Sequence, residues 1–171
     1  IPQTNPLRLG GREGYFADPM IVSRIEVVSG ASAVQGMGAT GGIINTITRR
    51  PTQAGTRQTL ELKYGTQFHG DSASWKTGYM VEHKSDFDLI AYLGARSQQV
   101  GVDGAGRPLA TESLHQAADG FIKIGKDFGP QRLQLMLNRF TAEGFDDRVD
   151  VPGNRATGLP TTSARGTLAY D

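Results

Sequence analysis

"SRIEVVSGASAVQGMGATGGIINTITRRP", residues 23–51, decides how the N-terminal part of this chain folds. Two runs rich in β-branched residues, 25–28 and 43–48, flank a glycine-rich stretch. They predict two strands joined by a tight, irregular connection. Pro51 would end any strand pairing at the close of the stretch. Residues 1–51 therefore form one region, and the sequence changes character after it.

The glycine-rich stretch contains Gly36, Gly38 and Gly41, which spell the G-x-G-x-x-G fingerprint of dinucleotide-binding turns. Such a turn follows a strand directly and opens a helix. Here the first β-branched run ends well before Gly36, and the run 43–48 after Gly41 favours a strand. Glu61, at the distance of a ribose-binding acid, lies beyond Pro51. A soluble dinucleotide-binding enzyme is therefore the least favoured alternative.

From about residue 57 the sequence alternates apolar and polar residues, which is the period of a β-strand. The alternating segments are 58–68, 74–83, 87–96, 117–128, 132–140 and one that starts near 164. Met80, Ile90 and Tyr92 break the alternation on the polar side. The residues that share the apolar face include Leu60, Leu62, Tyr64, Phe68, Trp75, Tyr79, Leu89, Leu93, Ile122, Ile124, Phe128, Leu133, Leu135 and Leu137.

Strand length and connection length both favour an antiparallel transmembrane β-barrel over a soluble all-β sheet. The segments approach the roughly 9–11 residues of a tilted membrane-spanning strand, whereas soluble strands average roughly five or six. The connections at 83–86 and 128–131 are tight, and those at 97–113 and 143–162 are long, as in outer-membrane barrels. Phe68, Trp75, Phe87 and Phe128 lie near strand ends, which suits an interfacial aromatic girdle.

Composition excludes several kinds of chemistry. The absence of cysteine excludes disulfides, thiolate zinc sites and thiol catalysis. The 18 basic and 17 acidic residues balance, so charge gives no argument for nucleic acid. No apolar run is long enough for a transmembrane helix. The chain begins at Ile1 with no visible signal peptide, and we expect it to be a fragment.

No catalytic, cofactor or metal site is predicted. The histidines, His69, His83 and His115, have no ligand spacing. The acidic residues Glu143, Asp146, Asp147 and Asp150 could hold a hard cation, but they lack the spacing of an EF-hand loop. A solvated loop is the favoured reading of these residues. We therefore expect a protein that is not an enzyme.

The stretch 23–51 resembles the end of the plug domain of TonB-dependent outer-membrane receptors. The family pattern reads roughly R-I-E-V-x-R-G-P-x-S-x-x-Y-G-x-x-A-x-G-G-x-I-N-I-x-T-K-x-P. Ser29 stands where the family has an arginine of the charge cluster that joins plug to barrel, and Gln35 stands where it has tyrosine. The residues expected to carry the structural plug motif are Arg24, Glu26, Gly30, Gly36, Gly41, Gly42, Asn45 and Pro51.

The resemblance implies a fold and a function. Residues 1–51 would be the C-terminal part of a plug, and 52–171 the first five or six strands of a 22-stranded barrel in a Gram-negative outer membrane. The family imports scarce nutrients, most often ferric siderophores, with energy from the TonB–ExbB–ExbD complex, which would engage an N-terminal segment. Haem, cobalamin and oligosaccharide receptors share the motif. A passive porin-like barrel would have no reason to carry it.

The resemblance also indicates where ligand contacts would lie. They would come from plug apices and from the long loops, such as 98–113 and 144–161. Arg24 and Glu26 either face charged partners in the plug or barrel or form an exposed pair. No cofactor is implied, because the iron chelate would be cargo.

Overall fold

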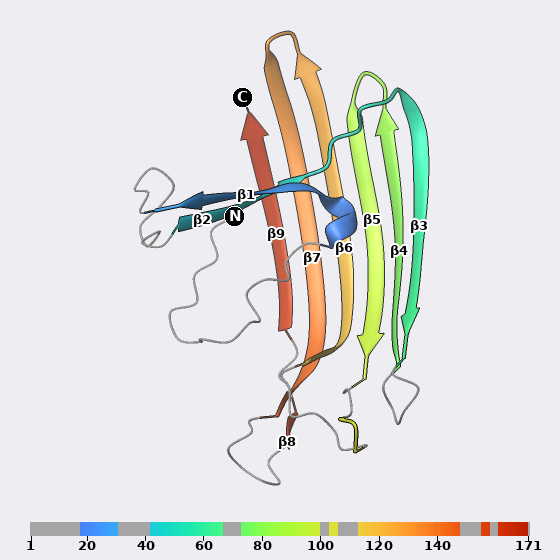
Figure 1. The fold of residues 1–171 in the computed structure, drawn as a ribbon. Helices are drawn as coiled ribbons and strands as arrows, with labels where there is room; N and C mark the ends of the chain where they lie inside the picture. Colours follow the sequence, from blue (N-terminus) through green and yellow to red (C-terminus); the bar gives the residue numbers. More distant parts are fainter. Residues whose placement is uncertain are drawn as a thin grey trace. The chain divides into compact units, whose positions relative to one another are not determined.

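The computed structural model describes residues 18–30, 42–66, 73–99, 103–105, 113–147, 155–157 and 161–170. The chain divides into two compact units, Ile1–Arg50 and Pro51–Asp171, and each is described by itself. The first unit contains a two-stranded sheet and the second a seven-stranded sheet (Figure 1). All pairings between the described strands are antiparallel.

In the first unit, a short 3-10 turn, Pro19–Ile21, leads into a hairpin. The Asp18 carboxylate caps this turn and accepts a hydrogen bond from the backbone N–H of Met20 at 2.9 Å. Strand β1 (Val22–Ser29) then pairs with β2 (Gly42–Thr48), and the last pair is Ser29 with Gly42. The β-branched run after the glycine-rich stretch is thus a strand, as the sequence predicts, and not the helix that a dinucleotide turn requires.

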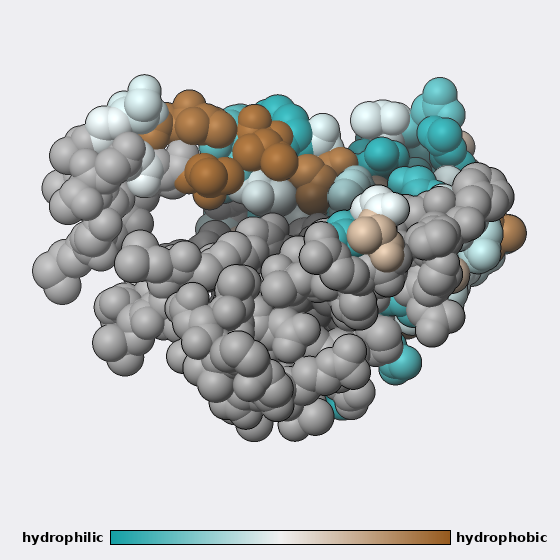
Figure 2. All heavy atoms as spheres, turned by 60° about the horizontal axis from the view of Figure 1, so that its bottom comes forward, coloured by the Kyte–Doolittle hydropathy of each residue, from teal (hydrophilic) through white to brown (hydrophobic). Residues whose placement is uncertain are grey.

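The hairpin of β1 and β2 exposes apolar side chains. Ile25, Val27, Val28 and Ile44 are each more than half exposed. Figure 2 shows hydrophobic residues gathered where Figure 1 draws this hairpin. Among the described residues of the first unit, the hairpin therefore has no second layer over these positions.

The second unit is a meander of long strands. In sheet order, β3 (Gly55–Gly65), β4 (Ser74–Lys84), β5 (Asp88–Gln98), β6 (Ser113–Phe128) and β7 (Gln131–Asp147) lie side by side (Figure 1). Two further strands, β8 (Arg155–Thr157) and β9 (Thr161–Tyr170), both pair with β7. The pairing of β8 covers residues 145–147 of β7, and that of β9 covers residues 133–142.

The tight turns of the meander lie at one end of the sheet (Figure 1). One is the bend 85–87 between β4 and β5, and the other is Gly129-Pro130 between β6 and β7. Gly129 has a φ of +63°, and the following proline fixes its own φ near −65°, which is the signature of a type II′ hairpin turn. The connections 66–73, 99–112 and 148–160 join strands at the opposite end.

The structure places a strand at each of the six alternating segments, with two differences. The strands β6 and β7 are 16 and 17 residues long, so β7 continues through Asp147, where the sequence analysis expected loop from residue 143. This expectation is wrong because pairing with β6 extends the strand through residues of low strand propensity, including Gly144. The short strand β8 was not predicted.

No helix in the described part of the chain is long and apolar enough to cross a membrane.

Gly42 is the residue on which the first hairpin depends. Its φ is +133°, and a Cβ at this position would lie 2.5 Å from the carbonyl oxygen of Val28. We therefore expect Gly42→Ala in the full-length protein to destabilise the hairpin by about 1–3 kcal/mol. Hydrogen–deuterium exchange of peptides covering residues 22–29 would show it as lost protection.

The matched control is Gly120→Ala. A Cβ there meets Leu93 at 3.6 Å, an ordinary van der Waals distance. Equal protection of residues 22–29 in the Gly42→Ala variant and the wild type would contradict the prediction.

Candidate functional site

The register of the second sheet gathers the apolar positions of all the long strands on one side, called here the apolar face. The row that contains Leu62 runs through Thr77, Ala95, Ala118 and Thr141. Fourteen large side chains of this face are between 40% and 75% exposed. They are Leu60, Leu62, Tyr64, Trp75, Tyr79, Leu93, Ile122, Ile124, Phe128, Leu133, Leu135, Leu137, Leu168 and Tyr170.

The apolar band crosses the sheet diagonally. In β3 it is centred on Leu62, but in β7 it is centred on Leu135, six residues from Thr141, the β7 member of the Leu62 row. Four strand-to-strand steps separate β3 from β7, so the band shifts by about 1.5 residues per strand. With a rise of about 3.4 Å per residue and a strand spacing of about 4.8 Å, the band makes an angle of about 45° with the rows. Strands of closed barrels tilt by a similar angle, roughly 35–45°.

Aromatic side chains lie at both edges of the band. Tyr64 and Trp75 lie toward the long connections, and Phe87 and Phe128 lie beside the tight turns. The structure thus leaves Trp75, Phe87 and Phe128 exposed near strand ends, where the sequence predicts them. Phe68 lies outside the described residues.

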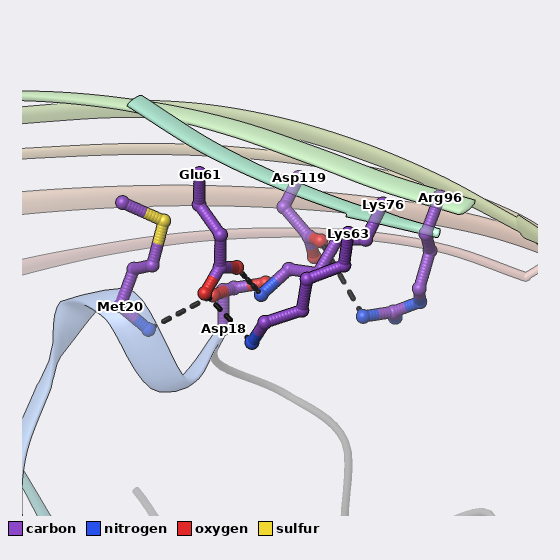
Figure 3. A network of polar contacts seen from close by, with 7 residues as sticks. All are labelled: Asp18, Met20, Glu61, Lys63, Lys76, Arg96 and Asp119. Atoms are coloured by element: carbon purple, nitrogen blue, oxygen red, sulfur yellow. Dashed lines mark hydrogen bonds and ion pairs between the residues drawn. The ribbon is translucent and has the colours of Figure 1, made fainter. Parts of the chain in front are cut away.

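The opposite side, called here the polar face, carries ion pairs between neighbouring strands. Lys63 and Lys76 are in direct register, and both ammonium groups contact the carboxylate of Glu61 (Figure 3). Arg96, next to Lys76 in β5, points toward Asp119 of β6 at 3.9 Å. Like charges opposite each other in a sheet destabilise it, so the shared carboxylate offsets the repulsion between the lysines.

Near the tight turns, one arginine joins three strands of the polar face. Arg132 of β7 donates to Asp127 of β6 at 2.7 Å and to Asp88 of β5 at 2.8 Å. Gly125 makes the longer reach possible, because a Cβ at this position would clash with the Arg132 guanidinium. The Arg132 and Asp88 side chains are only 15% and 9% exposed, whereas Asp127 is 55% exposed.

The apolar residues that break the alternation, Met80, Ile90 and Tyr92, lie close together on the polar face. Met80 pairs with Tyr92, and Tyr92 pairs in turn with Phe121. These residues and Ile90 are at most 3% exposed. The Tyr92 ring lies over Gly94, and it fills the space that a Cβ at position 94 would need. The sequence could flag these residues as exceptions, but only the register shows that they meet.

In the first unit, Arg24, Glu26 and Asn45 form a polar cluster on the hairpin. Arg24 Nε donates to Glu26 Oε1 at 2.7 Å, and Asn45 Nδ2 donates to Glu26 Oε2 at 3.2 Å. The hydrogen bond from Arg24 and its positive charge, with the Asn45 bond, lower the pKa of Glu26. The Arg24 and Glu26 side chains are 63% and 43% exposed, so this ion pair lies at the surface of the described structure.

The remaining residues of the predicted plug motif fall into two groups. Gly30 and Gly42 have positive φ values, and Pro51 is buried. Gly36 and Gly41 lie outside the described residues.

The cluster of Arg132, Asp127 and Asp88 was not predicted. The tight turn at 129–130 places Arg132 opposite Asp127, so this pair could have been predicted from the sequence. The link to Asp88 could not, because it depends on the register of β5 with β6.

No group of residues suited to a metal ion occurs among the described positions. The acidic side chains at 143, 146, 147 and 150 lie outside the side chains that the structure describes.

Two curated proteins match most of the chain. The rhizobactin receptor of Rhizobium meliloti (strain 1021) is 46% identical over 153 residues, which cover 85% of this chain. The ferric aerobactin receptor of Klebsiella pneumoniae is 39% identical over 150 residues, which cover 87% of this chain. The chain is homologous to part of each of these two receptors.

The match covers only part of these receptors. The chain spans 20% of the length of the rhizobactin receptor and 17% of that of the ferric aerobactin receptor. Both relatives are receptors and neither is an enzyme. A scan against models of protein families found no match, and no solved structure matches the chain.

The Arg132 cluster predicts unequal losses of stability for its two aspartates. Asp88→Asn changes a carboxylate that is nearly buried beneath Arg132, whereas Asp127→Asn changes one that is largely in solvent. We expect Asp88→Asn to cost about 1–3 kcal/mol of unfolding free energy and Asp127→Asn less than about 1 kcal/mol. Urea unfolding of the full-length protein in detergent micelles measures both losses, and equal losses would contradict the prediction.

Proposed function

We propose that the chain is part of a TonB-dependent outer-membrane receptor that imports a ferric siderophore by energy-coupled active transport. The observation that carries this proposal concerns the two faces of the second sheet. Its apolar face is exposed, and its polar face carries the ion pairs. The likeness to two proteins named as siderophore receptors supports the choice of substrate class.

In this proposal, residues 1–51 are the C-terminal part of the plug, and residues 52–171 are the first strands of a 22-stranded barrel. The apolar face would lie against the hydrocarbon of the membrane, and the polar face would line the lumen. The diagonal course of the apolar band supports this arrangement. When strands are tilted, a band that is parallel to the membrane plane must shift along each successive strand. The ion pairs of the polar face suit a polar interior.

The partners would be a ferric siderophore outside the cell and the TonB–ExbB–ExbD complex on the inner side. Ligand binding would bias the plug toward a state that TonB engages, which is a linkage between two sites. The match of residues 23–51 to the plug pattern supports a plug, with Arg24, Glu26, Gly30, Gly36, Gly41, Gly42, Asn45 and Pro51 in structural roles. Ligand contacts are proposed for the long connections 98–113 and 148–160.

Haem, cobalamin and oligosaccharides are the alternative cargoes, because receptors for them share the plug motif. The two relatives, receptors for rhizobactin and for ferric aerobactin, favour a siderophore. The side chains that the structure describes include no motif that favours one of the alternatives.

Membrane placement predicts that an arginine impairs assembly at one of two adjacent residues of β9 and not at the other. Leu168 lies on the apolar face opposite Leu135, and Thr167 lies on the polar face opposite Met136; both are exposed. We expect Leu168→Arg in the full-length protein to reduce the amount of folded receptor in the outer-membrane fraction. An arginine on a lipid-facing strand costs about 2–4 kcal/mol at the bilayer midplane.

Thr167→Arg is the matched control and should assemble like the wild type. Equal assembly of the two variants would contradict a membrane-facing apolar side.

Import is tested by uptake. Cells that carry the full gene should accumulate radiolabelled ferric rhizobactin or ferric aerobactin, whereas a deletion strain should not. Collapse of the proton gradient should abolish accumulation, because the energy comes from the inner membrane. Normal uptake by the deletion strain, or accumulation of haem or cobalamin in place of iron, would overturn the assignment to siderophores.

A further inference from the structure

Among the residues whose side chains the structure describes, the apolar face carries two charged ones, and they lie on opposite sides of the apolar band. Lys126 of β6 lies two residues beyond Ile124 in the direction of the tight turns. Arg139 of β7 lies two residues beyond Leu137 in the direction of the long connections. Both are exposed. Lys126 is therefore the cation that marks the tight-turn edge of the band.

Lys126 contacts one aromatic ring and lies next to the position of a second, just before the neighbouring strand β5. Its Nζ lies 5.3 Å from the centroid of the Phe128 ring, within the range of a cation–π contact. Gly125, its neighbour in the chain, pairs with Asp88, so Lys126 lies beside the position of Phe87. The Phe87 ring lies 5.4 Å from that of His83. These residues form what we call the turn-side cluster: His83, Phe87, Lys126 and Phe128.

We propose that the turn-side cluster binds the headgroup of an anionic phospholipid. This inference rests on the proposed membrane placement of the apolar face. The Lys126 ammonium would donate to the phosphate, and the exposed rings of Phe87 and Phe128 would lie at the boundary between headgroups and hydrocarbon, where aromatic residues gather.

The position of Lys126 favours a phospholipid over free phosphate. On the apolar face it is flanked by Ile124 in its own strand and by Leu133 next to it in β7, both about 41% exposed. Acyl chains of a lipid held at Lys126 would cover these two side chains. Free phosphate would contact the ammonium alone.

The experiment is lipid binding by the full-length receptor in detergent micelles, followed by native mass spectrometry. Phosphatidylglycerol is titrated against phosphatidylcholine for the wild type, Lys126→Gln and Lys63→Gln. Lys63 is an exposed lysine of the polar face and serves as the control. We expect Lys126→Gln to weaken phosphatidylglycerol binding about fivefold, the effect of one lysine near an anionic surface. Phosphatidylcholine binding and the Lys63→Gln variant should not change.

Three results would overturn the proposal. They are equal phosphatidylglycerol binding by the wild type and Lys126→Gln, an equal loss in Lys63→Gln, or displacement of the lipid by millimolar inorganic phosphate. Ferric-siderophore uptake by the same variants separates this inference from the proposed function. Normal uptake with no lipid selectivity would reject only the lipid site, and absent uptake by the wild type would reject only import.

Discussion

The cross-strand register of the second sheet is the constraint on which the rest of the structure depends. Side chains alternate between faces, so a slip of one residue in any pair would move its apolar set to the other side. The ladders from β3 to β7 hold rows such as Leu62, Thr77, Ala95, Ala118 and Thr141 without interruption. The register irregularity in β6, between Leu114 and Gln116, lies outside the apolar band. The band is continuous because the register is.

The ion pairs of the polar face depend on the same register. Glu61 contacts lysines of β3 and β4, the Arg96–Asp119 pair links β5 to β6, and Arg132 links β7 to β6 and β5. The Glu61–Lys76, Arg96–Asp119 and Arg132–Asp127 pairs join neighbouring strands, whereas the Arg132–Asp88 pair reaches across β6. A charge on this face that lost its partner would remain in a partly buried setting, which is why removal of one member costs more than the pair contributes.

The sequence predicted the features that repeat, and it missed those that depend on a single pairing. Period-two alternation located all six long strands, and the Gly129-Pro130 dipeptide located their tightest turn. The ends of β6 and β7 were missed because their ladder extends through residues with weak strand propensity. Arg132 and Asp88 are 44 positions apart, so no local pattern could join them. Met80 and Tyr92 break the alternation in the sequence, and only the register of β4 with β5 shows that they are paired.

The length of β7 has a mechanical consequence. Its part of the apolar band ends at Leu137, yet the strand continues to Asp147 and stays paired with β6 as far as Phe145. Ten further residues of paired strand span about 33 Å, or roughly 23 Å of height if the strand is tilted by about 45°. Paired strands are much stiffer than a single chain. In the proposed receptor, the connection after Asp147 would therefore start well beyond the apolar band, and a ligand that approaches from outside the cell would meet it first.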